Sequence, residues 1–228
     1  MRRAAVFAML LWSLGAVAQA PDVATILTKV SDTFVKAKTY HFVGKAEVIR
    51  DGLPDLDESL QMEIVIRRQD RMRFSFQGKM LAIVNGDQIS LVDAETGESK
   101  TMKRQPMPVD TGRDEDLLEN TDRGFIIRYR SFASVPQLAR LLPEQTIEAD
   151  GGRHACYVLE IRAKITDPEA NRAGESKGVY TWWVDKDRFI VLREDMRSAD
   201  GKYSSSIVFS VAKVNEPLDE SLFRVPVK

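Results

Sequence analysis

The chain has 228 residues, of which 43% are hydrophobic, 29% charged and 8% aromatic. This is the composition of an ordinary globular protein, and it excludes the collagen-like, disulfide-scaffold and wholly disordered classes. Lys and Arg number 33 against 34 Asp and Glu, which leaves a formal net charge of −1. The chain has no basic excess with which to neutralise phosphates, so we expect no nucleic-acid partner.

The first residues have the pattern of a cleaved export signal. Two arginines precede an apolar stretch over residues 4–17 that is too short to span a bilayer, and small residues follow it. We predict a signal peptide over residues 1–18. The alternative cut, after Ala20, would leave Pro21 directly behind the scissile bond. An uncleaved N-terminal anchor is the less favoured reading, because the apolar stretch is short.

A leader with such a short basic start is typical of bacteria, so we expect the protein in the periplasm. No cysteine stands near the cleavage site, so we expect no lipid anchor there, and we expect the mature chain to be soluble. The single cysteine, Cys156, rules out an intramolecular disulfide. Stability must therefore come from the core.

A period of 3.6 residues predicts a helix over residues 22–38. Its apolar side chains recur at i, i+3, i+4 and i+7, and they are Val23, Ile26, Leu27, Val30, Phe34 and Ala37. After Thr39 the period changes to two, which predicts strands with one apolar and one polar face. These strands lie over 40–50, 60–66, 72–76, 80–84, 89–92 and 98–103, with a strong hairpin signal at Asn85-Gly86-Asp87.

Residues 104–124 break this pattern with prolines and the acidic run Asp114-Glu115-Asp116, and a short helix is predicted through Leu117-Leu118. Ser134 then resembles an N-cap with Gln137 three residues later. Three leucines follow at helical spacing before Pro143, so we predict a second helix over 134–142.

A second group of strands follows, and a closing helical turn is predicted over 217–223. The strands lie over 145–149, 154–165, 179–184, 189–196 and 203–214. The count is ten or eleven strands and two or three helices, in a single domain over 19–228. A barrel, a sandwich or a curved open sheet would fit. A sheet this long must curl, because strand twist accumulates. If it stays open, its inner face is an apolar trough that the helices can cap.

Four segments resemble the LolA/LolB lipoprotein-carrier superfamily. Residues 26–40 resemble its opening helix and first strand, 66–74 a hairpin, 182–194 a late hairpin, and 214–226 its closing segment. The chain departs from the family at Gln69, where a proline is typical, and in the insertion over 104–124. It is therefore identified as a divergent member.

The resemblance implies a mainly antiparallel α+β fold, a strongly curved unclosed half-barrel with a helical lid. It also implies a hydrophobic trough that holds acyl chains of lipoproteins or other lipids, and membrane-bound donor and acceptor proteins as partners. We carry over the fold and this ligand class, and leave a role in outer-membrane lipoprotein sorting open. We expect a monomer.

The candidate trough consists of apolar residues that alternate on adjacent strands. They are Met62, Ile64, Ile66, Met72, Phe74, Phe76 and Trp182. The candidate lid residues come from the two predicted helices, and they are Ile26, Leu27, Val30, Phe34, Leu138 and Leu141. The competing interpretation is a filled hydrophobic core, which alternation alone does not distinguish from a hollow trough.

The sequence predicts no enzyme, cofactor or metal site. His154 and Cys156 share a strand face, but the third group that a nucleophilic pair needs is not visible. The two histidines, His41 and His154, are too far apart in sequence for a zinc motif. The acidic run lacks the alternating oxygen ligands of a calcium loop.

An alternative function is an envelope protein-interaction or stress-sensing module on the same fold, without lipid cargo. The acidic loop 113–122 and a local group of arginines would then carry the binding. That group is Arg67, Arg68, Arg71 and Arg73. We favour the plainer interpretation of these arginines as a solvated hairpin edge, where charge also blocks strand-to-strand aggregation.

Overall fold

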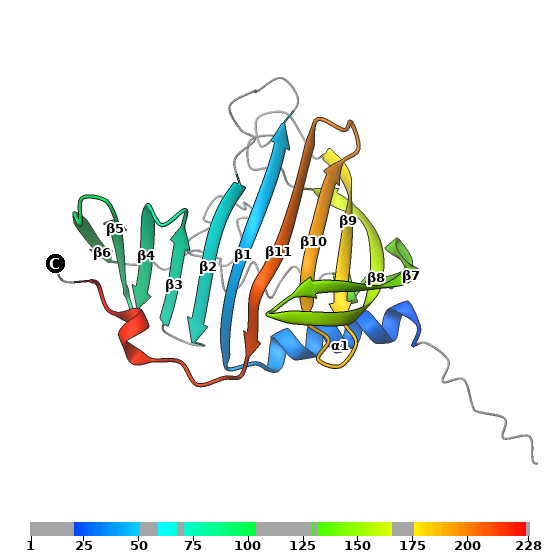
Figure 1. The fold of residues 1–228 in the computed structure, drawn as a ribbon, viewed down its shortest axis with the longest axis horizontal. Coiled ribbons are helices and arrows are strands. Elements are labelled where there is room, and N and C mark those ends of the chain that lie inside the picture. Colours follow the sequence, from blue (N-terminus) through cyan, green and yellow to red (C-terminus); the bar gives the residue numbers. More distant parts are fainter. Residues whose placement is uncertain are drawn as a thin grey trace, which may run out of the picture.

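The computed structural model describes residues 21–50, 59–67, 71–103, 129, 132–165 and 176–226. The predicted signal peptide, the turn at 69–70, the acidic run and the short helix at 117–118 lie outside these ranges. The described strands form one antiparallel sheet of eleven strands in the order β6-β5-β4-β3-β2-β1-β11-β10-β9-β8-β7. Figure 1 shows that this sheet curls without closing into a barrel, as the resemblance to the LolA/LolB superfamily implies.

The predicted strands are present, with their ends adjusted by one to several residues. In chain order the elements are α1 (Val23–Lys36), β1 (Thr39–Arg50), β2 (Ser59–Arg67), β3 (Arg71–Phe76), β4 (Met80–Asn85), β5 (Gln88–Asp93), β6 (Ser99–Lys103), η2 (Pro136–Leu138), β7 (Ala139–Ala149), β8 (Gly152–Ile165), β9 (Ser176–Asp185), β10 (Val191–Ser198), β11 (Tyr203–Val214) and η4 (Glu220–Phe223).

Helix α1 forms where the apolar stripe predicts it. The carboxylate of Asp22 caps its first turn by accepting a hydrogen bond from the Thr25 N–H at 2.7 Å. The apolar stripe is buried from Ile26 onward, and Val23 at its start is partly buried. The helix ends at Lys36, and the extended backbone of its C-cap Ala37 leads into β1.

Strand β1 divides the sheet, because it pairs with β2 on one side and with β11 on the other. A register shift between Val43 and Gly44 interrupts its ladder with β11. The ring of Phe209 packs closely over this point. A Cβ atom on Gly44 would lie 3.0 Å from that ring, so glycine permits the close approach.

On the β11 side the sheet rolls up on itself. The β7–β8 hairpin crosses the neighbouring strands and its tip reaches β11 (Figure 1). There the Asp150 N–H donates to the Phe209 carbonyl at 2.9 Å, and the Asp150 carboxylate accepts from the Ala212 N–H at 2.8 Å. We call α1 together with β7–β11 the rolled half.

On the other side of β1, strands β2–β6 extend as a flatter part of the sheet, which we call the wing (Figure 1). Residues 215–226, the C-terminal strap, run from the end of β11 to the outer face of the wing. Asn215 attaches the strap to the start of β1 through its N–H to the Thr39 carbonyl. At the far end Val225 packs against a small cluster of Leu81, Ile83 and Val92.

The prediction of a helix over residues 134–142 is wrong. Only Pro136–Leu138 forms a single 3₁₀ turn, and strand β7 begins at Ala139. Pro143 lies inside this strand. It is tolerated because β7 is an edge strand, and because a register shift separates Leu142 from Gln145. The closing helical turn is confirmed, but it begins at Glu220 with Asp219 as its N-cap.

Candidate functional site: the inner face of the wing

The predicted trough residues of β2 and β3 lie on one face of the wing. Antiparallel pairing places Met62 opposite Phe76, Ile64 opposite Phe74, and Ile66 opposite Met72. Residues that pair directly project from the same face of a sheet. The alternation in the sequence thus identified a continuous apolar face across two strands.

This face continues into the core beneath α1. Tyr40 pairs with Ile66, and Phe42 pairs with Ile64, so the two aromatic residues of β1 extend the same rows. Both rings stack on Phe34 of α1, with centroids about 6 Å apart. We therefore call this the inner face.

The rows also extend outward to the edge of the sheet. Phe76 pairs with Met80 on β4, Ala82 pairs with Leu91, and Ile89 pairs with Met102 on β6. Sequence reasoning missed Met80, Leu91 and Met102 as part of this face. The apolar run over 80–84 has no alternation to orient it. The strand register that the Asn85-Gly86 turn sets could have been used to assign these residues to the face.

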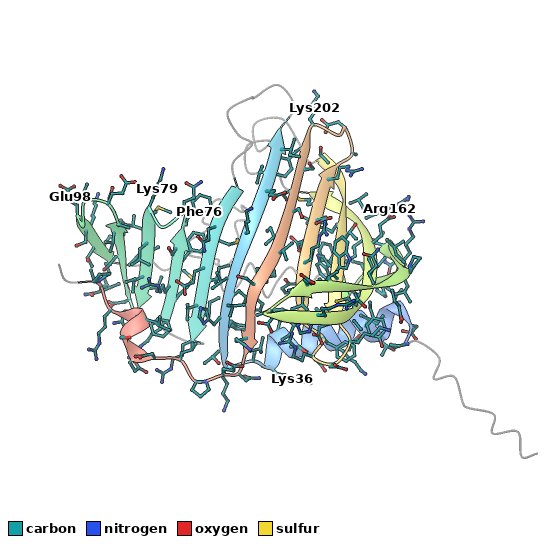
Figure 2. The ribbon with its side chains drawn as sticks, viewed as in Figure 1. Lys36, Phe76, Lys79, Glu98, Arg162 and Lys202 are labelled. Atoms are coloured by element: carbon teal, nitrogen blue, oxygen red, sulfur yellow. The ribbon has the colours of Figure 1, made fainter. Side chains whose placement is uncertain are left out.

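Exposure rises from the centre of the inner face towards its rim. Ile64, Ile66 and Met72 are buried, while the side chains of Met62, Phe74 and Phe76 are partly exposed. Met80 is 40% exposed and Met102 is 39% exposed. Phe76 stands at the end of β3, beside the turn that carries Lys79 (Figure 2). The inner face thus presents a partly solvated apolar rim next to a buried core.

Trp182 lies in a different environment from the other predicted trough residues. It belongs to the rolled half, where it is fully buried and packs against the rings of Tyr129 and Phe132. Its indole N–H donates to the buried carboxylate of Glu194 at 2.8 Å. Trp183, the next residue along β9, donates instead to Gln145 and lies beneath Arg193, so the two indoles point to opposite faces of the sheet.

Of the two helices predicted to form the lid, the structure contains the first, α1, but not the second. Ile26, Leu27, Val30 and Phe34 are buried under α1, on the side that faces the sheet. Leu138 is exposed, and Leu141 lies in β7 opposite Leu159. The lid role predicted for these two leucines relied on the helix that the structure does not contain.

The arginines of the β2–β3 hairpin project from the outer face of the wing. Arg67 and Arg71 both pair with Glu220 of the C-terminal strap. The guanidinium of Arg73 lies 3.4 Å from the Glu63 carboxylate, which also contacts His41 at 3.0 Å. Burial raises the pKa of Glu220, but the hydrogen bond from Arg67 and the charges of both arginines outweigh it and leave that pKa below its usual value. Arg68 lies outside the described residues.

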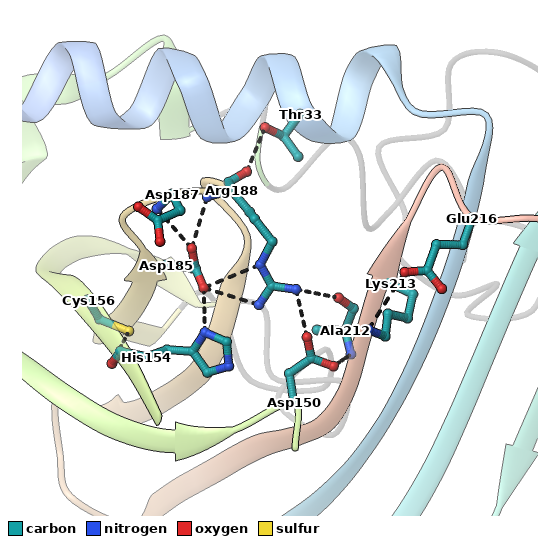
Figure 3. Close-up of polar contacts among 10 residues, drawn as sticks. All are labelled: Thr33, Asp150, His154, Cys156, Asp185, Asp187, Arg188, Ala212, Lys213 and Glu216. Atoms are coloured by element: carbon teal, nitrogen blue, oxygen red, sulfur yellow. Dashed lines mark hydrogen bonds and ion pairs between the residues drawn. The ribbon is translucent and has the colours of Figure 1, made fainter. Parts of the chain in front are cut away.

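A polar network fastens the rolled half under α1 (Figure 3). The Arg188 guanidinium bridges the carboxylates of Asp150, at 2.6 Å, and Asp185, at 3.1 Å. Asp185 also contacts Nδ1 of His154 at 2.8 Å. Burial raises the pKa of Asp185, but hydrogen bonds from Arg188 and Asp187 outweigh it and hold that pKa below its usual value. This network joins the β7–β8 hairpin tip, the β9–β10 turn and β11.

The geometry of Cys156 does not suit a nucleophile. Its side chain is fully buried, and Sγ faces the His154 carbonyl at 3.5 Å (Figure 3). Burial raises the pKa of the thiol to about 12. A thiolate is the reactive form, so a thiol with this pKa is inert near neutral pH. The imidazole of His154 is engaged by Asp185 instead.

Among the residues that the structure describes, no three His, Cys, Asp or Glu side chains gather in a way that could hold a metal ion. No helix within the described ranges is long and apolar enough to cross a membrane.

Sequence comparisons find no relative, but the fold has solved counterparts. No family model and no curated protein matches the chain. The lipoprotein LppX of Mycobacterium tuberculosis superposes with a TM-score of 0.50 at 15% identity, over 86% of this chain and 97% of LppX. LprF from Mycobacterium bovis gives 0.52 at 14% identity, over 90% and 96%.

A chain of the Pseudomonas aeruginosa MucA/MucB complex gives a TM-score of 0.49 at 14% identity. It is matched over 90% of this chain and 62% of its own length. LppX and LprF have a LolA-like fold. Similarity at this level of identity concerns the fold, and it confirms the resemblance found in the sequence: the chain is an unclosed half-barrel of the LolA/LolB type.

Proposed function

We propose that this chain is a periplasmic carrier or binding protein that holds acyl chains of lipoproteins or other lipids on the inner face of the wing. One observation supports this most directly. Apolar side chains at the rim, above all those of Phe74, Phe76 and Met80, remain partly exposed although they continue the rows of the buried core. Contiguous exposed apolar surface of this kind marks binding sites for apolar partners.

The affinity would come from removing the acyl chain and the rim from water together. Each buried methylene contributes roughly 0.8 kcal/mol, so a long acyl chain gains ample binding energy if the face is already formed. The aromatic rings offer broad flat contacts. Met62, Met80 and Met102 are flexible and polarizable, which suits chains that differ in shape.

Helix α1 is positioned to act as the lid. It covers the end of the inner face where Tyr40 and Phe42 lead into the core, and Phe34 contacts both rings. An acyl chain that lay along these rows would reach the buried stripe of α1. Displacement of α1 by a membrane-bound donor or acceptor protein would then open or close the site.

The leader over residues 1–18 would direct the chain to the periplasm. A carrier there must move its cargo through water between two membranes, and burial of the acyl chain against the inner face supplies that shielding. Sorting of outer-membrane lipoproteins is the specific role that the resemblance suggests.

The test is to express the full chain in a bacterial host, purify it from the periplasmic fraction and record native mass spectra. We expect bound phospholipid or acylated peptide, which extraction and lipid analysis would identify. Phe74→Asp places a charge on the inner face and should abolish this binding. Gln61→Asp, at an exposed position on the outer face of β2, is the matched control and should keep it.

A bare polypeptide mass, still bare after incubation with phospholipid vesicles, would contradict the proposed function. Equal lipid occupancy in Phe74→Asp, with folding confirmed by circular dichroism, would place the lipid elsewhere. In the first case the interaction-module alternative becomes the better explanation, and partner capture with the full chain is the next experiment.

A further inference from the structure

Methionines gather on the inner face of the wing. Of the five methionines among the described residues, four lie on this face: Met62, Met72, Met80 and Met102. They come from four different strands, and cross-strand pairing sets each beside an aromatic or aliphatic neighbour. Met80, for example, pairs with Phe76, and Met102 pairs with Ile89.

These methionines differ sharply in how much water they contact. Met80 and Met102 are 40% and 39% exposed, whereas Met72 is only 5% exposed. Met62 is intermediate. The thioether sulfur of an exposed methionine is open to small oxidants, and that of a buried one is protected. The two most accessible methionines therefore stand at the rim where an acyl chain would meet the protein.

We propose that Met80 and Met102 are oxidation sites that switch off acyl-chain binding at the inner face. This inference rests on the proposed function. The oxidant is a peroxide or hypochlorous acid. With hydrogen peroxide, one oxygen is transferred to the methionine sulfur as the O–O bond breaks, and the other leaves as water after a proton shift. The sulfur is oxidised by two electrons and the peroxide is reduced by two.

The sulfoxide changes the rim in the direction that disfavours an acyl chain. It converts a flexible apolar side chain into a polar one that water solvates strongly. Contact with a hydrocarbon chain would then remove hydration from the S=O group without supplying a hydrogen bond. The core should tolerate the change, because both side chains stand at the rim and the buried Met72 stays reduced.

The matched control replaces the two sulfurs without altering the apolar surface. Leucine is close to methionine in volume and cannot be oxidised in this way, so the double variant Met80→Leu/Met102→Leu keeps an apolar rim, and its affinity after peroxide is compared with its own affinity before peroxide. The double variant Met80→Gln/Met102→Gln places polar side chains at the same points and mimics the oxidised state without any oxidant.

The experiment measures binding of a fluorescent C16 fatty acid before and after hydrogen peroxide treatment. Peptide mass mapping locates each gain of about 16 Da. We expect oxidation of Met80 and Met102 ahead of Met72, with affinity lowered by about tenfold, because a polar group must be desolvated. The leucine variant should be unaffected by peroxide and the glutamine variant weak from the start. Methionine sulfoxide reductases should restore binding to the oxidised parent chain.

Three results would overturn the inference, and they separate it from the proposed function. Unchanged affinity with both methionines oxidised would refute the switch while leaving lipid binding intact. An equal loss in the leucine variant would assign the effect to other residues. No binding of the fatty acid before oxidation would reject the proposed function, and the inference with it.

Discussion

The rolled half and the wing are built from the same sheet and the same kind of alternating sequence, but they use their inner faces differently. In the rolled half Trp182, Tyr129 and Phe34 are fully buried. In the wing the rim residues Phe74 and Phe76 stay partly exposed. The curl of the sheet accounts for the difference, since the β7–β8 hairpin folds back onto β11 on one side of β1 only.

Under the proposed function, this contrast separates the residues that stabilise the fold from those that bind the ligand. Buried residues in the rolled half contribute transfer and packing energy to the folded state, so their loss should unfold the protein. Partly exposed residues in the wing contribute less free energy to folding, because water already contacts them in the folded state. Substitutions there should affect ligand affinity more than folding. The four predictions below test this division, from the largest expected effect on stability to the smallest.

The largest effect is expected at the centre of the rolled half. Trp182→Ala removes the largest fully buried side chain and a hydrogen bond to the buried Glu194, and it should cost about 3–5 kcal/mol. Urea unfolding followed by circular dichroism measures the free energy. Trp182→Phe keeps most of the packing and should recover part of the loss. A cost below about 1 kcal/mol for the alanine variant would show that this half is not the stabilising one.

The polar network under α1 should give the next largest effect, and it should depend on pH. The pKa of Asp185 lies below its usual value of 3.8, since hydrogen bonds from Arg188 and Asp187 outweigh the opposing effect of burial. A carboxylate with a lowered folded pKa stabilises the protein above the unfolded value and loses that contribution as the pH falls through the folded value. Asp185→Asn should therefore cost about 2 kcal/mol at pH 7.

The deficit of Asp185→Asn relative to the parent chain should shrink as the pH falls from 3.8 through the lower folded pKa of Asp185, because below the folded pKa the parent carboxylate is protonated in both states. Unfolding free energies measured in urea from pH 7 down to the acid transition test this. A deficit that stays constant over that range would assign the stabilisation to something other than the charge of Asp185.

In the wing, Phe74→Ala should cost only about 1–2 kcal/mol of stability, because the ring is partly exposed. Under the proposed function the same variant should lose at least tenfold in fatty-acid affinity, since a large aromatic contact is removed. Parallel urea and fluorescence titrations measure both quantities on one preparation. A stability cost as large as that of Trp182→Ala would remove the distinction between the two halves.

The smallest effect is expected at the boundary between the halves. A Cβ on Gly44 would lie 3.0 Å from the Phe209 ring and 3.3 Å from the Val208 carbonyl oxygen. Gly44→Ala should therefore cost about 1 kcal/mol net, after the gain from the less flexible unfolded chain. Adding Phe209→Leu should relieve the clash with the ring. If the loss of unfolding free energy in the double variant equals or exceeds the sum of the losses in the two single variants, Gly44 does not act by accommodating that ring.

Much of the fold follows from local pattern. The alternation over 60–66 and 72–76 predicted the strands and their common face, because side chains in a strand point to opposite faces in turn. The helical stripe before Lys38 predicted α1 and its buried side. The turn residues Asn85-Gly86 located a hairpin that the structure contains.

The error over 134–142 shows where local pattern fails. Ser134, Gln137 and the leucines satisfy the requirements of a helix, but the same leucines also satisfy those of a strand that pairs with β8. Pairing of Leu141 with Leu159 and Leu142 with Val158 decides between the two. The partner residues lie beyond the turn that joins the two strands, outside the window over which the helical spacing of the leucines is judged.

The sequence by itself determined most of the elements, their apolar faces and the resemblance to a half-barrel family, because periodicity and turn chemistry act over a few neighbouring residues. The tertiary structure decided which apolar residues become core and which form a rim. Trp182 and Phe74 are both apolar residues in strands with alternating polarity. Trp182 is buried beneath Tyr129 and Phe132, whereas Phe74 is partly exposed to water. Burial depends on what packs above a face, and only the tertiary structure brings Tyr129 and Phe132 over Trp182.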